Sequence, residues 1–371
     1  MTIQSELREY GWINMPQSTQ KLPKNLSLLL YSLAHFTVDF SCFFILFKNF
    51  SMSTSMLTTS IIFLLYNCIA FGIQPIIGYR FDQCPNKHHY LLSITGIALI
   101  ILAVFFSFLP FWTQVILCGT GNALFHVGGG INSLSFSNGK TARYGFFASF
   151  GALGVAAGTY MGLFHFHKNY SVILLLFLSS LSLILFCRKE QTPETIPLPA
   201  SFSPYQVKNP MILVLSSLLV VLLTSYTGIL LVVNYHNTVP LVFCYVGIAI
   251  FSGRYLGGVL ADHFGARTTG FITLLLAAAL LIFGQQSITV WLLGLIFLNC
   301  NTSITLGYVV YTMPNNPGFS FGLTKLAMLI GATIPFFLAL PHNLVLIAII
   351  TMCIFSSLAL YLPLNPKPIT T

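Results

Sequence analysis

The sequence predicts an all-α membrane protein whose chain crosses the bilayer about twelve times, as two halves of six helices each. Three observations support this fold class. Hydrophobic residues make up 56% of the 371 positions and charged residues only 6%, too few to cover a soluble protein with polar side chains. Apolar stretches of about 20 residues, long enough to cross a bilayer core of roughly 30 Å, follow one another with short polar breaks. One loop motif also occurs twice, at equivalent places in the two halves.

Six spans are expected in the first half of the chain, each bounded by polar residues. A helix satisfies its own backbone hydrogen bonds in lipid, so each apolar run is interpreted as one helix. The spans are expected near residues 25–47, 55–78, 89–109, 112–136, 142–163 and 170–187. Residues 1–24 contain charged and polar side chains but no short apolar core, so they are expected to be a cytoplasmic segment and not a removable signal peptide.

The second half is expected to repeat this plan after a polar, proline-containing linker at 188–209. Its spans are expected near residues 210–233, 239–260, 268–285, 289–311, 317–340 and 343–362. The two six-helix bundles therefore correspond to 25–187 and 210–362, followed by a cytoplasmic tail at 363–371.

The distribution of basic residues orients these spans, because short loops rich in Lys and Arg stay on the cytoplasmic side. With the amino terminus inside, most of the sixteen Lys and Arg residues fall in inside segments, and only Lys48 and Lys168 fall outside. This asymmetry predicts a multi-pass protein of the plasma membrane with both termini in the cytoplasm. It also accounts for the net charge of +9, so no nucleic-acid partner is expected.

The repeated motif occurs in the loops after the second span of each half. Each copy has a glycine, an aspartate four residues later and a basic residue nine residues later. The second copy, Gly-x-Leu-Ala-Asp-x-x-Gly-x-Arg at 258–267, resembles the signature loop of the major facilitator superfamily, and the copy at 78–87 is similar to a degraded form of it. The resemblance covers essentially the whole chain and implies two six-helix bundles with a substrate site at their interface.

The same resemblance implies a conformational role for the motif residues, which latch helices together on the cytoplasmic side. Glycine lets helices approach closely, and an aspartate at a helix end can pair with a base or with the positive pole of a neighbouring helix. The alternative is simple solvation of the loops. The residues concerned are Gly78, Asp82, Gly258, Asp262, Gly265 and Arg267.

A narrower resemblance involves three segments in the first half. His35-Phe-x-x-Asp39, Gln74-Pro75-x-x-Gly78 and Gly121-Asn-Ala-Leu-Phe-His126 resemble the fosmidomycin-resistance branch of drug exporters. In this chain Val127 and three glycines follow His126, where those exporters continue with Pro and polar or acidic residues. This resemblance implies proton-coupled export of a drug or another small anion.

Ionisable residues at membrane depth are costly and are therefore functional candidates. Asp39 is the only carboxylate within a predicted span, and His35 lies one helical turn before it on the same face. Together they are the candidate proton-coupling pair, since a histidine changes charge near neutral pH. The alternative is a structural packing or capping pair.

Several polar residues in the spans are candidates for substrate binding. Lys325 has no acidic neighbour in its own helix, so its partner is expected to be Asp39 or a bound anion. Arg254 shares a helix face with Asp262, which leaves a latch contact and a substrate contact equally open. The excess of intramembrane positive charge predicts a substrate with a carboxylate or phosphonate group. The candidates are His126, Asn122, Lys325, Arg254, Asn301 and Gln74.

The sequence thus predicts a monomeric secondary transporter, not an enzyme, that exports a small anionic solute in exchange for protons. A proton-coupled importer of an organic anion remains an alternative, and an intramembrane enzyme or lipid-handling protein is a weaker one. No GxxxxGK[ST] loop and no HExxH-like group of residues is present, which argues against ATP-driven pumping and against hydrolysis. The eight cysteines lie far apart without metal-ligand spacing, so neither a metal site nor a cofactor is expected.

Overall fold

The structure of the protein is a computed structural model that describes residues 24–52, 56–84, 88–106, 110–164, 170–187, 196–234, 241–284, 287–337 and 340–366. The predicted segment 1–24 lies outside these residues except for Lys24. Residues 188–195 of the predicted linker and 367–371 of the predicted tail lie outside them as well. Most described residues are helical, as expected for a chain that must pair its backbone groups in lipid.

The first half is a series of helices with short connections. They are α2 (Lys24–Met52), α3 (Met56–Asn67), the π-helical turn η1 (Cys68–Gly72), α4 (Gln74–Asp82), α5 (His89–Phe105), α6 (Phe111–Phe136), α7 (Thr141–Phe164), α8 (Tyr170–Ser182) and the π-helical turn η2 (Leu183–Cys187).

The second half follows a short connecting segment and is also mainly a series of helices. Its elements are the 3-10 turn η3 (Ala200–Phe202), β1 (Tyr205–Val207), α9 (Pro210–Asn234), α10 (Val242–Phe264), α11 (Ala266–Phe283), α12 (Ile288–Asn299), α13 (Asn301–Thr312), α14 (Pro317–Phe337), α15 (His342–Tyr361) and β2 (Leu364–Pro366).

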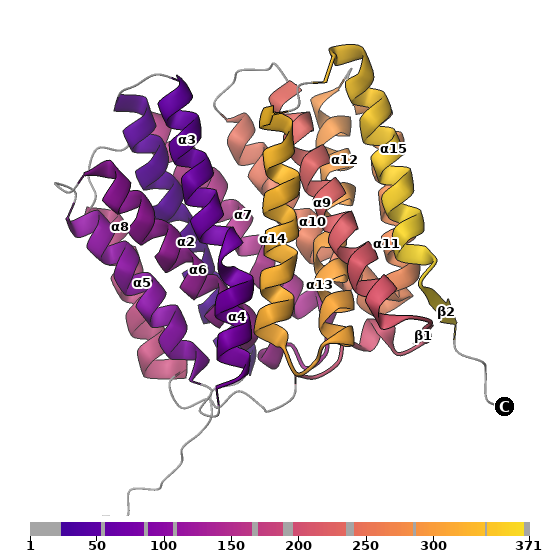
Figure 1. The fold of residues 1–371 in the computed structure, drawn as a ribbon, viewed down its shortest axis with the longest axis horizontal. Coiled ribbons are helices and arrows are strands. Elements are labelled where there is room, and N and C mark those ends of the chain that lie inside the picture. The colour runs from indigo at the N-terminus through magenta and orange to yellow at the C-terminus, as the bar shows by residue number, and fades with distance from the viewer. Residues whose placement is uncertain are drawn as a thin grey trace, which may run out of the picture.

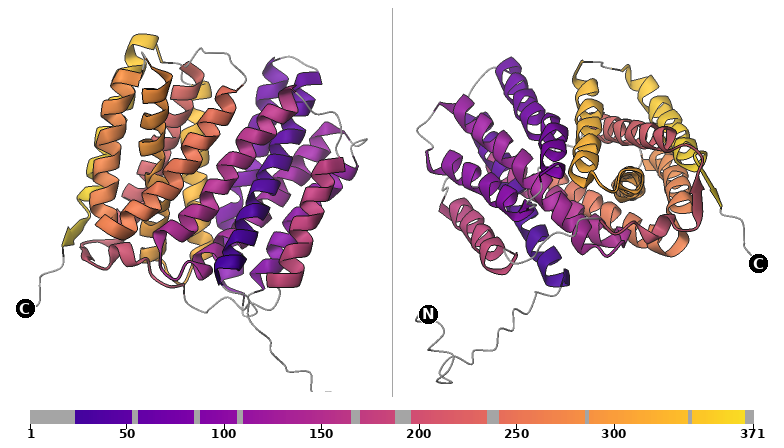
Figure 2. Two further views of the ribbon diagram at one scale, coloured as in Figure 1. Left: turned by 180° about the vertical axis from the view of Figure 1, so that it is seen from behind. Right: turned by 60° about the horizontal axis from the view of Figure 1, so that its bottom comes forward.

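The helices of the two halves form two groups that lie side by side (Figures 1 and 2). A large hydrophobic core lies mostly among α2 to α8 and another lies among α9 to α15. The halves pack against each other mainly through α7 with α10 and through α4 with α14. Each half therefore contributes one motif-bearing helix, α4 or α10, and one helix that packs against the motif-bearing helix of the other half, α7 or α14.

Nine helices within the described residues are long and apolar enough to cross a membrane, and His89–Phe105 and Ser171–Phe186 are shorter apolar helices. Helix α6, which coincides with the predicted fourth span, is not among the nine. It contains polar residues such as Gln114, Asn122 and His126, which are buried inside the protein and not exposed to lipid. The count of twelve crossings therefore stays a prediction.

Two predicted spans are broken in the structure. The span expected at 55–78 consists of α3, η1 and α4 and continues to Asp82. Pro75 stands in the first turn of α4 and has no N–H to donate to the preceding turn, which explains an irregular, π-helical backbone at this place. The span expected at 289–311 is interrupted at Cys300, between α12 and α13.

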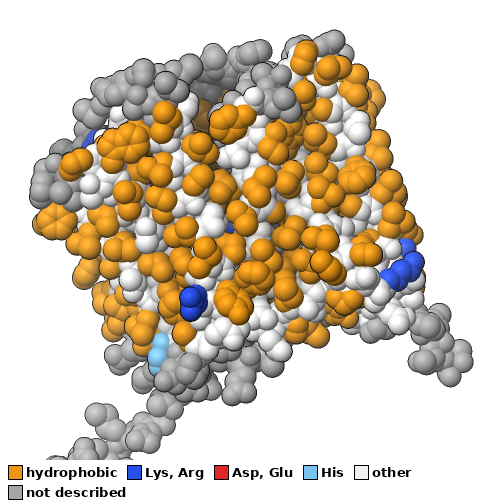
Figure 3. All heavy atoms as spheres, viewed as in Figure 1, with side chains coloured by type: hydrophobic (Ala, Val, Ile, Leu, Met, Phe, Trp, Pro, Cys, Tyr) orange, Lys and Arg blue, Asp and Glu red, His pale blue; other side chains and the backbone are white. Residues whose placement is uncertain are grey.

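The outer surface is apolar, as expected for contact with lipid. The face in Figure 3 is covered largely by hydrophobic side chains, with few Lys and Arg side chains. Large side chains such as Met211 and Phe283 are about two-thirds exposed, at 70% and 69%. In contrast, many polar side chains are buried between the helices. This distribution is the reverse of a soluble protein's, where polar groups face the solvent.

A small sheet joins the connecting segment to the carboxyl end. Strand β1 pairs antiparallel with β2, with Tyr205 opposite Pro366 and Val207 opposite Leu364. Residues 364–366 of the predicted cytoplasmic tail thus pair with residues 205–207 of the predicted linker. The boundaries assigned to the two bundles stay a prediction.

Candidate functional site

Helix α2 presents His35 and Asp39 on one face, one helical turn apart. Both residues are buried, with 1% and 4% of their surface exposed, and His35 Nε2 lies 3.2 Å from Asp39 Oδ2. The structure places the two residues of the predicted coupling pair in direct contact.

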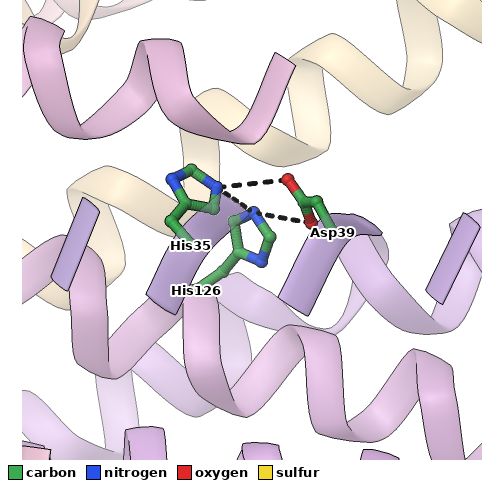
Figure 4. A group of neighbouring side chains, drawn as sticks. All are labelled: His35, Asp39 and His126. Atoms are coloured by element: carbon green, nitrogen blue, oxygen red, sulfur yellow. Dashed lines mark hydrogen bonds and ion pairs between the residues drawn. The ribbon is translucent and has the colours of Figure 1, made fainter. Parts of the chain in front are cut away.

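Helix α6 adds two polar side chains to this pair, His126, which Figure 4 shows beside His35 and Asp39, and Asn122. His126 Nε2 lies 2.9 Å from His35 Nε2 and 3.7 Å from Asp39 Oδ1. Asn122 Nδ2 donates a 2.8 Å hydrogen bond to Asp39 Oδ1. Sequence analysis assigned His126 and Asn122 to substrate binding, whereas the structure joins them to His35 and Asp39. These four residues are called the α2–α6 cluster.

Backbone carbonyl groups fix the protonation of both imidazole rings. His35 Nδ1 donates to the carbonyl of Phe147 at 2.8 Å, and His126 Nδ1 donates to the carbonyl of Asn122 at 3.0 Å. Because a carbonyl oxygen only accepts, each Nδ1 carries hydrogen, and each neutral ring has a bare Nε2 lone pair. Two such lone pairs, 2.9 Å apart beside a carboxylate, repel each other unless a proton or a metal ion lies between them.

Helix α7 covers the cluster closely. A Cβ atom on Gly151 would overlap His35 Nε2 and would lie 2.6 Å from Asp39 Oδ2, so only glycine permits this approach. The ring of Phe147 stacks on the ring of His35 with centroids 4.4 Å apart. The cluster is therefore enclosed by α7 as well as by α2 and α6.

Two basic side chains from the second half interact with the cluster. Lys325 of α14 interacts electrostatically with Asp39 and His126, and Arg254 of α10 interacts with Asp39. Arg254 Nη1 donates to the carbonyl of Ala148 at 2.9 Å, while Lys325 Nζ lies 5.1 Å from the ring centroid of Phe321. Among the described residues neither base forms an ion pair within 4.0 Å. Neither of the carboxylate pairings considered from the sequence, Asp39 with Lys325 and Asp262 with Arg254, is present at that distance.

Two other residues predicted to bind substrate form hydrogen bonds outside the cluster. Gln74 Nε2 donates to the carbonyl of Ala70, and Gln74 lies where α4 contacts Gly322 of α14. Asn301 Nδ2 donates to Thr273 Oγ1 at 3.2 Å, which places Asn301 between α13 and α11 inside the second half. The structure does not bring either residue to His35 and Asp39.

The first loop motif contacts the start of α14. Asp82 accepts hydrogen bonds from the backbone N–H groups of Gly318 and Phe319, at 3.0 and 2.8 Å. A Cβ atom on Gly78 would overlap the backbone of Gly318. The aspartate therefore satisfies N–H groups that a helix leaves unpaired in its first turn, and the glycine permits the approach.

The second loop motif makes the same contact with the start of α7. Asp262 accepts from the N–H groups of Thr141 and Ala142, at 2.8 and 2.9 Å. A Cβ atom on Gly258 would lie 2.6 Å from Ala142 Cα. Both aspartates thus bind the positive ends of helices in the opposite half, which is the second of the pairings considered from the sequence.

The remaining motif residues belong to the second half alone. Arg267 Nε donates to the carbonyl of Tyr361 at 3.0 Å, and its guanidinium lies 3.6 Å from the centroid of the Tyr361 ring. Gly265 adopts a φ of 83° between α10 and α11. Arg267 therefore fixes the end of α15 and does not contact Asp262.

Sequence analysis expected no metal site, but three side chains form a group that can hold a metal ion. The ligand atoms of His35, Asp39 and His126 lie within 4.8 Å of one another. His35 and His126 are 91 positions apart on different helices, so no local spacing signals the group. The role of the Phe147 carbonyl is also invisible in the sequence, because any residue can provide it.

Comparison with known proteins identifies the fold. No family model matches the sequence, and no curated protein matches it. Among solved structures, the major facilitator superfamily transporter FucP in its outward conformation covers 91% of this chain and 97% of its own, with 13% identity and a TM-score of 0.62. A variant of the Escherichia coli fucose:proton symporter FucP gives 13% identity and a TM-score of 0.60, with 91% of this chain and 97% of its own covered.

A bacterial homologue of the iron transporter ferroportin, in its outward-facing state, is also similar. It has 15% identity and a TM-score of 0.60, with 91% of this chain and 98% of its own covered. Together these likenesses show that the chain has the fold of major facilitator superfamily transporters.

Proposed function

We propose that this protein is a secondary transporter that moves a small organic anion by alternating access, coupled to protons. The fold is one that transporters use, and two of the similar structures are in outward states. In such folds, two bundles rock against each other around a central site. The contacts of Asp82 and Asp262 with the opposite half close one side of the molecule, the predicted cytoplasmic side.

The observation that carries the proposal is the division of buried charge between the halves. The first half provides the carboxylate of Asp39 with two histidines, and the second half provides Lys325 and Arg254. Rocking of the halves changes the distance between these opposite charges. Protonation of the cluster and occupancy by an anion would then each favour a different arrangement of the halves.

The coupling ion proposed is the proton, with His35, Asp39 and His126 as its carriers. One of the similar structures is described as a fucose:proton symporter, which shows that proton coupling occurs on this fold. The substrate proposed is a carboxylate or phosphonate bound by Lys325 and Arg254. The proposed direction of transport is efflux. The protein is proposed to lie in the plasma membrane as a monomer, with both termini in the cytoplasm.

The test uses purified protein in liposomes that contain a trapped pH-sensitive dye. A panel of phosphonates and carboxylates, beginning with fosmidomycin, is added against a preset pH gradient. We expect at least one anion to move protons through the wild type, with no movement through Asp39→Asn and weaker anion affinity in Lys325→Gln. Undiminished proton flux in Asp39→Asn excludes the carboxylate as a carrier, and unchanged anion affinity in Lys325→Gln excludes the proposed anion contact.

Import of an organic anion with protons is the second candidate. It uses the same residues, and the pH gradient distinguishes it from efflux. If the anion leaves the liposomes while protons flow in from an acidic exterior, the result supports antiport. If the anion leaves together with protons that flow out of an acidic interior, the result supports symport.

A further inference from the structure

The cluster contains three metal-ligand atoms at suitable distances. His35 Nε2 and His126 Nε2 are 2.9 Å apart, and the Asp39 oxygens lie 3.2 and 3.7 Å from these nitrogens. A tetrahedral ion with bonds of about 2.0–2.1 Å requires ligand atoms roughly 3.3–3.4 Å apart. The observed separations lie on both sides of this value, so small side-chain movements would admit an ion.

The surroundings hold these atoms in the form that a metal ion needs. Both Nδ1 atoms donate to backbone carbonyls, so both Nε2 lone pairs are free for an ion. Asn122 holds one oxygen of the Asp39 carboxylate. A histidine that binds metal usually donates its other ring N–H to a carbonyl or carboxylate in this way, which fixes its tautomer and orientation.

The ligand types select the class of ion. Ca²⁺ binds six to eight oxygen atoms and Mg²⁺ an octahedron of oxygen atoms, whereas this cluster offers two imidazole nitrogens and one carboxylate. That set suits Zn²⁺, Co²⁺ or Fe²⁺. We infer that His35, His126 and Asp39 form a binding site for a divalent transition-metal ion, whose fourth ligand is water or a solute.

The charged side chains near the cluster influence its affinity for a metal ion. Lys325 of α14, Arg254 of α10 and the buried Tyr66 of α3 all interact electrostatically with Asp39. The two basic side chains oppose a divalent cation. Removing the charge of Lys325 therefore strengthens metal binding, although the same change weakens binding of an anion.

The experiment is a titration of the purified full-length chain, free of any affinity tag, with Co²⁺ alone. Tetrahedral Co²⁺ with nitrogen ligands gives intense visible absorption, which reports both occupancy and geometry. We expect one Co²⁺ per chain in the wild type. Affinity should fall on the order of 10- to 100-fold or more in His126→Ala, because loss of even an outer partner has such an effect. Lys325→Gln should bind Co²⁺ more tightly than the wild type.

His263→Ala is the matched control, because His263 is exposed at the end of α10 and away from the cluster. It should bind Co²⁺ as the wild type does. Thermal unfolding without metal shows whether each variant is folded. Because an ion that binds the native fold raises its unfolding temperature, Zn²⁺ should raise the unfolding temperature of the wild type and of His263→Ala. Absence of the Co²⁺ spectrum in the wild type, or its persistence in His126→Ala, overturns the inference.

This inference does not rest on proton-coupled anion transport, and the two experiments fail separately. Co²⁺ binding without anion-driven proton flux rejects the proposed function and leaves the metal site. Anion-driven proton flux without Co²⁺ binding supports the proposed function and rejects the metal site.

Discussion

Asp82 and Asp262 stand 180 residues apart and make the same contact, each accepting two backbone N–H groups from the first turn of a helix in the other half. Asp82 binds the start of α14 and Asp262 binds the start of α7. The two contacts join the halves at the ends of α4 and α10. If the halves rock against each other, as proposed above, the two equivalent capping contacts stabilise one of the two arrangements.

Removal of the Asp262 carboxylate should weaken its contact with α7. In Asp262→Ala, the N–H groups of Thr141 and Ala142 lose their acceptor, and loss of such a cap costs about 0.5–2 kcal/mol. We expect faster hydrogen exchange in the first turn of α7, measured by mass spectrometry of peptides around residues 141–145. Asp262→Asn, which keeps an accepting oxygen, should show a smaller change. Equal protection in Asp262→Ala and the wild type would contradict this role.

Gly151 should be essential for the geometry of the cluster. A methyl group in Gly151→Ala would displace His35 and Asp39, and overpacking of this kind typically costs about 1–3 kcal/mol. The expected result is a lower unfolding temperature together with loss of gradient-driven transport. Gly228→Ala is the matched control, since a Cβ atom at Gly228 of α9 would have no neighbour within 4 Å. A functional Gly151→Ala protein would show that the cluster tolerates displacement.

The sequence predicts the helices well because bilayer thickness and backbone hydrogen bonding allow few alternatives. It does not predict the irregular turn at Cys68–Gly72 or the interruption at Cys300, which depend on local departures from helix geometry. The contact sites of Asp82 and Asp262 are also hidden, because an aspartate at a helix end has several potential partners. Only the assembled halves show that backbone N–H groups of α14 and α7 are those partners.

The sequence also predicts some contacts of the candidate site and not others. His35 and Asp39 are four residues apart on one helix, so helical geometry alone predicts their contact. The contact of His35 with His126 requires the register between α2 and α6, which a single sequence does not reveal. Asn301 is a polar residue at membrane depth that hydrogen-bonds to Thr273 of a neighbouring helix in its own half, and the sequence alone does not distinguish such a helix contact from a substrate contact.

Gly265 should be required for the turn between α10 and α11. Its φ of 83° is strained for a residue with a Cβ atom, and that atom would also overlap the Tyr205 hydroxyl. We expect Gly265→Ala to lose roughly 1 kcal/mol or more of stability, measured by thermal unfolding of the purified protein. If Gly265→Ala has the same unfolding temperature as the wild type, the turn relaxes without cost and the glycine is not required.

Two asparagines of α6 allow a test of whether Asp39 is charged in the resting protein. Asn122 donates one hydrogen bond to the Asp39 carboxylate at 2.8 Å, and Asn132 donates two to neutral groups, the Tyr31 hydroxyl and the Gly128 carbonyl, both at 2.9 Å. Both asparagines are buried, with 0% and 3% exposed. A hydrogen bond to a charged group contributes about 1.5–3 kcal/mol and one between neutral groups about 0.5–1.5 kcal/mol.

Replacement by leucine removes either donor at nearly constant volume. Asn122→Leu, which removes one bond to a charged group, should therefore lower the stability about as much as Asn132→Leu, which removes two bonds to neutral groups, measured by thermal unfolding under identical conditions. A second signature follows from the cluster: Asn122→Leu removes the amide that donates to Asp39, so a bound cation should stabilise this variant more than it stabilises Asn132→Leu. If Asn122→Leu loses only about half as much stability as Asn132→Leu, Asp39 is neutral in the resting state.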